Sequence, residues 1–225
     1  MAAARVAALA SAQAQAQAQA SGGARRRHLA FVYGTLKRGG HNHGLYLAAA
    51  EARGRARFLG EARTVDALPL LLRPERAVPC LVNVAGYPGA LRVRGELFEV
   101  DDACLAALDL VEGVAAGFYA VASLPVEPSL PPPGAAGAGE GAGAGVGGGG
   151  GAPVDALVYV YGPSPARFAS ADALPASGPV WDLVEASRRG GVAPLECFGP
   201  DQQRAYEPPR GGAPLAEALR LVEDA

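Results

Sequence analysis

A short apolar run near the start of the chain, LAFVYG from Leu29 to Gly34, most restricts the folds that this sequence can adopt. It combines aromatic and β-branched residues without a polar residue among them, which is typical of a strand buried on both faces. The run ends at once in a Gly-Thr turn, inside the segment FVYGTLKRGGHNH from Phe31 to His43. We therefore expect a buried strand that stops abruptly in a turn.

The turn after this strand has several free backbone donors and suits an anion. Because glycine adopts positive φ freely, Gly34 would let the N–H groups of Gly34, Thr35 and Leu36 converge into a nest, with the Thr35 hydroxyl as a further donor. Such a nest can hold a carboxylate. The same residues also fit an ordinary strand-ending turn, and Tyr33 either lines a pocket or fills the core.

Further apolar runs predict the remaining elements. The change of phase in the alternation of ALRVRGELFEV near Gly95 predicts a bulge there. A helix is expected after an N-cap at Asp101 or Asp102, and Gly113 terminates it. Strands are expected at 57–65, 68–72, 80–84, 90–100 and 154–162, and short helices at 179–188 and 214–224.

One carboxylate falls on the apolar side of the first predicted helix. Glu112 lies four residues after Leu108 and seven after Leu105, so on a continuous helix it shares their inward face. Burial and the negative end of the helix dipole would both raise its pKa, which suits a general base near neutral pH. The alternative is a frayed last turn with Glu112 in solvent beside Gly113.

Two other acidic residues compete with Glu112 for the role of base. Asp109 lies on a more polar side of the same predicted helix. Glu96 is next to the predicted bulge, where it would also serve as a structural hydrogen-bond acceptor. The sequence pattern favours Glu112 because only this carboxylate shares the apolar stripe.

The basic residues after the turn give weaker indications. Lys37 and Arg38 either attract a substrate carboxylate or belong to a solvated loop. His41 and His43 are two residues apart in a glycine-flanked loop with no carboxylate or cysteine nearby, so we expect no metal site.

Composition excludes some classes of partner. The net charge is −2 and the pI about 5.9, so no positive field favours nucleic acid or an acidic membrane surface. The longest apolar runs are shorter than the about 20 residues that a membrane-spanning helix needs. Cys80, Cys104 and Cys197 are odd in number and widely spaced, which favours a reducing compartment and a cytoplasmic protein.

Two low-complexity segments set the expected domain boundaries. Residues 1–27 are rich in Ala and Gln, contain no acid and end in three arginines, which fits either a disordered extension or an organellar transit peptide. Residues 128–153 are almost entirely Pro, Gly and Ala, so we expect a disordered insertion between two strands. A single domain over 28–225 with this insertion is the resulting prediction.

The segments FVYGTLKRGGHNH, PCLVNV, RGELFEVDDACLAALDLVEG and FYA together resemble the gamma-glutamylcyclotransferase (AIG2-like) family, particularly its gamma-glutamylamine cyclotransferase branch. The likeness covers about Leu29 to Val126, resumes at Val154 to Gly162 and has a looser counterpart in QRAYEPPR. Val121 and Cys80 differ from the residues expected at their positions in relatives, where an arginine and an aromatic residue are usual.

The resemblance implies a small mixed α/β (α+β) fold built on a curved, barrel-like sheet with flanking helices. By motif, Tyr33, Gly34, Thr35 and Leu36 would form the substrate-binding turn, Glu112 would be catalytic, and Tyr119 would lie near the pocket. The implied reaction uses no cofactor: the α-amine of a γ-glutamyl amine or γ-glutamyl amino acid attacks its own γ-carbonyl and releases 5-oxoproline. The alternative is a non-catalytic module that binds a glutamyl-like ligand or a protein partner.

Overall fold

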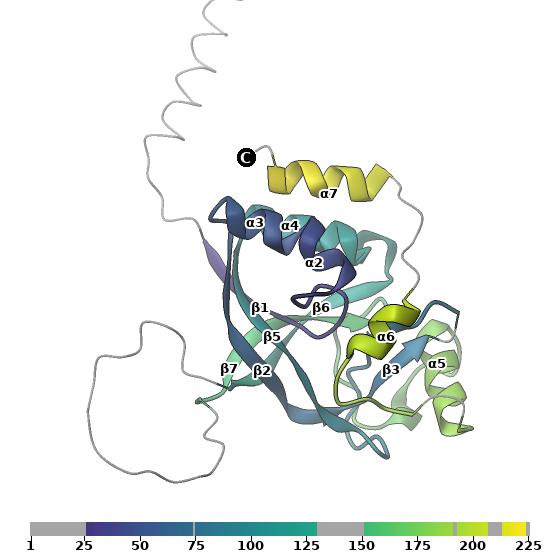
Figure 1. Cartoon of the computed structure of the whole chain (residues 1–225). Helices are drawn as coiled ribbons and strands as arrows, with labels where there is room; N and C mark the ends of the chain where they lie inside the picture. Colours follow the sequence, from purple (N-terminus) through teal and green to yellow (C-terminus); the bar gives the residue numbers. More distant parts are fainter. Residues whose placement is uncertain (1–25, 74, 130–150, 191–192, 207–212, 224–225) are drawn as a thin grey trace, which may run out of the picture.

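The computed structural model describes residues 26–73, 75–129, 151–190, 193–206 and 213–223 (Figure 1). The predicted extension at 1–27 lies almost entirely outside these residues, and so does most of the predicted insertion at 128–153. None of the helices in the described ranges is long and apolar enough to cross a membrane.

A closed barrel of five strands forms the centre of the fold, in the order β1-β5-β2-β6-β7. The strands are β1 (Arg27–Val32), β5 (Leu91–Asp101), β2 (Ala56–Leu68), β6 (Tyr119–Pro128) and β7 (Val154–Tyr161). Neighbours pair antiparallel except β1 and β7, whose parallel pairing closes the barrel. A separate hairpin of β3 (Leu70–Arg73) and β4 (Val78–Leu81) adjoins it. The expected mixed α/β fold with a barrel-like sheet is confirmed.

The two faces of the barrel wall belong to two apolar clusters. Alternate residues of all five strands, Phe31, Ala62, Leu97, Ala122 and Val158 among them, fill the interior. The residues between them face outward, where α3 (Leu47–Ala52) and α4 (Asp102–Val111) cover the barrel and α7 (Ala213–Glu223) packs on these two helices (Figure 1). The first strand is therefore buried on both faces at Ala30, Phe31 and Val32, as its composition predicted.

The prediction of a bulge at Gly95 is wrong. Gly95 pairs regularly with Ala62, and the irregularities lie on β2, between Phe58 and Gly60 and between Arg63 and Ala67. The alternation of β5 changes phase because its last residues are buried on both faces, by the barrel interior and by the helices. Glycine is needed at position 95 for another reason: a Cβ there would lie 2.4 Å from the carbonyl oxygen of Val32.

The helix that leads to Glu112 begins as predicted. Asp101 is the N-cap of α4, and its side chain accepts a hydrogen bond of 2.9 Å from the N–H of Cys104. Gly113 ends the helix with φ 64°, in the left-handed region that favours glycine. Cys104, Ala107 and Leu108 are buried under α7 and against the barrel, which fixes the direction in which the C-terminal end of α4 points.

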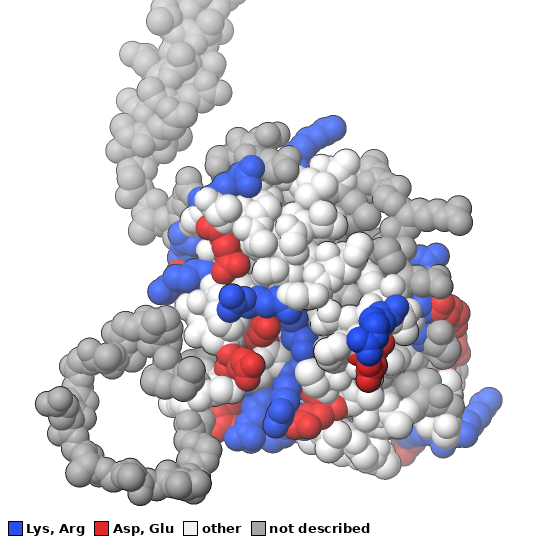
Figure 2. Space-filling model, in the orientation of Figure 1, with Lys and Arg blue, Asp and Glu red and all other residues white. Residues whose placement is uncertain are grey.

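Smaller elements complete the described chain. They are α2 (His41–Leu45), the 3₁₀ turns η1 (Val114–Ala116) and η2 (Ala171–Ala173), α5 (Pro179–Arg188) and α6 (Pro200–Ala205). On the face shown in Figure 2, Lys and Arg side chains lie beside Asp and Glu side chains. Ion pairs among the described residues include Arg57–Glu99 and Arg63–Glu127.

Candidate active site

A cavity of about 890 Å³ opens where the turn after β1, the C-terminal end of α4 and the outer face of β6 and β7 meet. All six predicted site residues line this cavity: Tyr33, Gly34, Thr35, Leu36, Glu112 and Tyr119. The segment after α6 contributes Tyr206, and α7 contributes Leu219. Most of the lining is apolar or aromatic, so a few polar groups determine what the cavity can bind.

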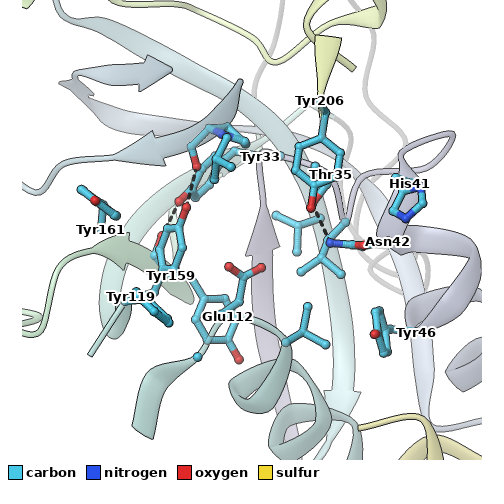
Figure 3. Close-up of a pocket in the computed structure, with 18 of the residues that line it drawn as sticks. Tyr33, Thr35, His41, Asn42, Tyr46, Glu112, Tyr119, Tyr159, Tyr161 and Tyr206 are labelled. Carbon is cyan, nitrogen blue, oxygen red and sulfur yellow. Dashed lines mark hydrogen bonds between the residues drawn. The ribbon is translucent and has the colours of Figure 1, made fainter. Parts of the chain in front are cut away.

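Glu112 is the C-cap residue of α4, with helical φ and ψ of −81° and −5°. Its carboxylate projects into the space between Tyr33 and Tyr159 on one side and Thr35 and Asn42 on the other (Figure 3). Burial raises its pKa to about 7. No described residue forms an ion pair with it, so nothing in the described chain offsets this desolvation. The carboxyl group can therefore both accept and return a proton near neutral pH.

The turn after β1 has the expected free donors, but its conformation differs from the predicted nest. Gly34 does not take a positive φ. It is required because a Cβ there would lie 2.7 Å from Cγ of Pro79. Within the described ranges, no residue accepts a hydrogen bond from the N–H groups of Gly34, Thr35 or Leu36. These N–H groups at the cavity wall are therefore available to a ligand.

Thr35 is oriented by the first turn of α2. The Nδ2 group of Asn42 donates to Oγ1 of Thr35 at 3.0 Å, and the N–H of Asn42 donates to the carbonyl of Thr35 at 3.0 Å. Because the Thr35 oxygen accepts from Asn42, its own proton is directed elsewhere. Asn42 was not among the predicted site residues, although it lies in the motif that drew attention to this turn.

Tyr33 and Tyr119 line the cavity with their rings while their hydroxyl groups bind the backbone. The Tyr33 hydroxyl donates to the carbonyl of Tyr159 at 2.5 Å, and that of Tyr119 donates to the carbonyl of Pro79 at 3.0 Å. Burial raises the pKa of both phenols well above the usual value, so both stay neutral. These two tyrosines hold β1, β4, β6 and β7 together around the cavity.

The competing acids do not line the cavity. Asp109 accepts a hydrogen bond of 2.7 Å from the Tyr159 hydroxyl, and Glu96 accepts one of 2.8 Å from the N–H of Arg38. Both are therefore structural acceptors, which was the alternative considered for Glu96. Among the described residues that line the cavity, Glu112 is the acidic one.

The basic residues of the turn also point away. Lys37 Nζ lies 3.0 Å from Sγ of Cys197, and the Arg38 guanidinium stacks on Phe58 at 4.3 Å from the ring centroid. The cations at the cavity wall are instead Arg73 and Arg76, which the sequence patterns did not indicate. In the described part of the chain, no group of three His, Cys, Asp or Glu side chains could hold a metal ion.

Comparison with known proteins identifies the family of this chain. Residues 30–182 match the model of the family described as gamma-glutamyl cyclotransferase, AIG2-like. This match covers more than half of the chain. The chain belongs to the AIG2-like gamma-glutamyl cyclotransferase family. The six predicted site residues all lie within the matched range.

Individual members of the AIG2-like family agree with this assignment. A gamma-glutamylaminecyclotransferase of Bos taurus is 45% identical over 82 residues, which are 36% of this chain and 46% of the relative. One of Rattus norvegicus is 42% identical over 83 residues, covering 37% and 53%. This chain thus aligns with about half the length of these curated relatives. The crystal structure of an AIG2-like protein from Mus musculus matches with a TM-score of 0.55 and 26% identity, over 83% of this chain and 99% of that one.

Proposed function

We propose that this chain is a cyclotransferase that acts on a small γ-glutamyl amine or γ-glutamyl amino acid and releases 5-oxoproline and the free amine. The observation that carries this proposal is Glu112, an acid with a pKa raised to about 7 that lines the same cavity as the YGTL turn. Membership of the AIG2-like family and relatives named gamma-glutamylaminecyclotransferase support it.

The turn after β1 would bind the glutamyl end of the substrate. Its free N–H groups at Gly34, Thr35 and Leu36 and the Thr35 hydroxyl are donors for the α-carboxylate. The rings of Tyr33 and Tyr119 would bound the aliphatic part of the glutamyl chain. Folding this flexible chain into an attack geometry can contribute about 7 to 11 kcal/mol to a well-oriented intramolecular reaction.

Glu112 would carry the proton that the reaction moves. As a carboxylate it accepts a proton from the substrate ammonium, whose pKa is about 8 to 10 in solution. The freed α-amine attacks the γ-carbonyl carbon and forms the new C–N bond of a five-membered lactam. Glu112 returns its proton to the leaving nitrogen as the original amide C–N bond breaks. The second proton, which the attacking nitrogen loses on becoming the lactam N–H, passes through the regenerated carboxylate to the released amine, which leaves as an ammonium ion. Backbone donors would stabilise the negative charge that develops on the carbonyl oxygen.

The test is release of 5-oxoproline from ε-(γ-glutamyl)-lysine and γ-glutamyl-alanine by wild type and Glu112→Gln. Glutamine preserves the shape of the side chain but cannot take the proton, so we expect about a 10²- to 10⁴-fold loss of kcat. Glu96→Gln is the matched control, because that carboxylate lies outside the cavity. Unchanged activity in Glu112→Gln would remove this residue from the mechanism. Tight binding without release in wild type would favour the non-catalytic module.

A further inference from the structure

One hydrogen bond joins the end of α4 to the barrel wall. The hydroxyl of Tyr159 in β7 donates to Oδ1 of Asp109, in the last turn of α4, at 2.7 Å. Among the described residues, no other side-chain hydrogen bond connects this turn of the helix to the barrel. The neighbouring Leu110 and Val111 contribute apolar packing, which is not directional. The bond to Tyr159 therefore specifies how the end of α4 lies against β7.

Asp109 lies close to Glu112 on the same helix. It precedes Glu112 by three residues, and residues three apart are neighbours on a helix surface. Within the described ranges, the Glu112 carboxylate forms neither an ion pair nor a hydrogen bond. Its position therefore comes from the backbone that carries it. In the cavity wall, the carboxylate projects beside Tyr159, the partner of Asp109 (Figure 3).

Tyr159 is also bound from the side of the substrate turn. Its carbonyl accepts the hydrogen bond of 2.5 Å from the hydroxyl of Tyr33, the first residue of the YGTL turn. Tyr159 is buried, and β7 holds it in register with Val121 of β6. Two hydrogen bonds to one residue thus connect the turn that has the free donors with the helix that carries the acid. The separation of turn and acid is set through Tyr159.

We propose that Asp109 and Tyr159 are positioning residues, whose hydrogen bond holds Glu112 at a fixed distance from the turn that binds the glutamyl end. This inference rests on the proposed function. Asp109 does not line the cavity, so it acts through Glu112 and touches no reacting atom. A reacting group displaced by about 1 Å can cost about 100-fold in rate, so loss of the bond should act on kcat. The turn donors bind the substrate separately, so KM should change little.

The experiment measures 5-oxoproline release from ε-(γ-glutamyl)-lysine and γ-glutamyl-alanine by Asp109→Ala, Tyr159→Phe and the double variant. Each single change removes one side of the bond, and phenylalanine preserves the ring of Tyr159. We expect each to lower kcat about 10- to 100-fold, with KM within about twofold of wild type. The double variant should lose no more than either single variant, because both changes remove the same bond.

Two further variants separate the bond from charge and from general packing. In Asp109→Asn the amide oxygen still accepts from the Tyr159 hydroxyl, so kcat should stay within about threefold of wild type. Asp102→Ala is the matched control on the same helix. Oδ1 of Asp102 lies 2.7 Å from Nε2 of His28 at the opposite end of α4, so its loss should leave kcat unchanged.

A second readout does not depend on catalysis. NMR titration of the Glu112 carboxyl carbon, assigned with Glu112→Gln, follows the pKa of this group. The pKa should be about 7 in wild type and in Asp109→Asn. In Asp109→Ala it should fall toward the ordinary value of 4.5, because the released helix end lets water reach the carboxylate.

The outcomes distinguish this inference from the proposed function. If wild type is active and the two single losses multiply in the double variant, the inference is overturned and the cyclotransferase stands. The same holds if Asp109→Asn is as impaired as Asp109→Ala. If wild type releases no 5-oxoproline from either compound, the proposed function fails and the titration decides the inference. An unchanged pKa of Glu112 in Asp109→Ala then overturns it, and a fall in that pKa supports it.

Discussion

At the scale of single residues, the cost of placing Glu112 in the cavity should be measurable as stability. Its pKa is about 7 in the folded chain, above its ordinary value of 4.5, so the folded state holds the proton more tightly. The contribution of protonated Glu112 is complete below about pH 4.5 and is lost as the pH rises to about 7. Across this window the stability of wild type relative to Glu112→Gln should fall by about 1.4 kcal/mol per pH unit.

Chemical denaturation of both proteins between pH 4 and 8 measures this difference. Glu96→Gln is the comparison. Burial also raises the pKa of Glu96, but this carboxylate accepts its hydrogen bond outside the cavity. A stability difference between wild type and Glu112→Gln that does not vary with pH would mean that Glu112 has an ordinary pKa, and the basis for its role would be lost.

Asn42 should act on catalysis through Thr35. Its Nδ2 group donates to Oγ1 of Thr35, so Asn42→Ala frees the hydroxyl to rotate and weakens its contact with the substrate. We expect kcat/KM to fall about tenfold, as for a lost hydrogen bond to a charged group, with little change in Tm. Steady-state kinetics of Asn42→Ala, Thr35→Val and the double variant measure the coupling. If the two losses multiply in the double variant, Asn42 acts independently of Thr35 and this prediction is wrong.

At the scale of elements, the turn after β1 packs closely on the β3–β4 hairpin where Gly34 meets Pro79. A Cβ at position 34 would lie 2.7 Å from Cγ of Pro79, and the carbonyl of Pro79 accepts the hydrogen bond of Tyr119. Gly34→Ala should therefore cost about 1 to 3 kcal/mol in the free energy of unfolding and lower kcat/KM by displacing the turn.

The matched control for Gly34→Ala is Gly44→Ala in α2. Position 44 has no atom within 4 Å of an added Cβ and no positive φ, so alanine should be neutral or stabilise by up to about 1 kcal/mol. Urea denaturation of the two variants measures the difference. Equal stability of the variants would show that Pro79 yields without cost.

Elements with a strong local pattern were predictable, and those that depend on tertiary contacts were not. The apolar run of β1, the Asp101 cap and the stripe leading to Glu112 are all local in sequence. Helices α2 and α3 have no side-chain N-cap hydrogen bond, and β6 contains Pro125, so their sequences give weak signals. Tyr206 and Arg76 reach the cavity from distant segments of the chain. No local periodicity of the sequence indicates that placement.

At the scale of the whole molecule, the cavity is complete only when the C-terminal part of the chain covers it. Tyr206 and Leu219 line the cavity, and Ala218 and Val222 of α7 are buried in the same apolar cluster as α4 and the outer face of the barrel. The helix that carries Glu112 is thus held between the barrel and α7. Because Leu219 of α7 lines the same cavity as Glu112, we expect α7 to limit the access of water to this carboxylate and so to contribute to its raised pKa.

Val222→Asp should therefore change the proton chemistry as well as the packing. A charge at this fully buried position separates α7 from α4, because an unpaired buried carboxylate is costly. Water then reaches Glu112 past Leu219, its pKa falls toward the ordinary value, and the rising limb of the kcat/KM profile moves to lower pH. Ala216→Asp is the control, since it adds the same charge on an exposed position of α7. If Val222→Asp loses activity at every pH without moving the limb, α7 stabilises the fold but does not set the pKa of Glu112.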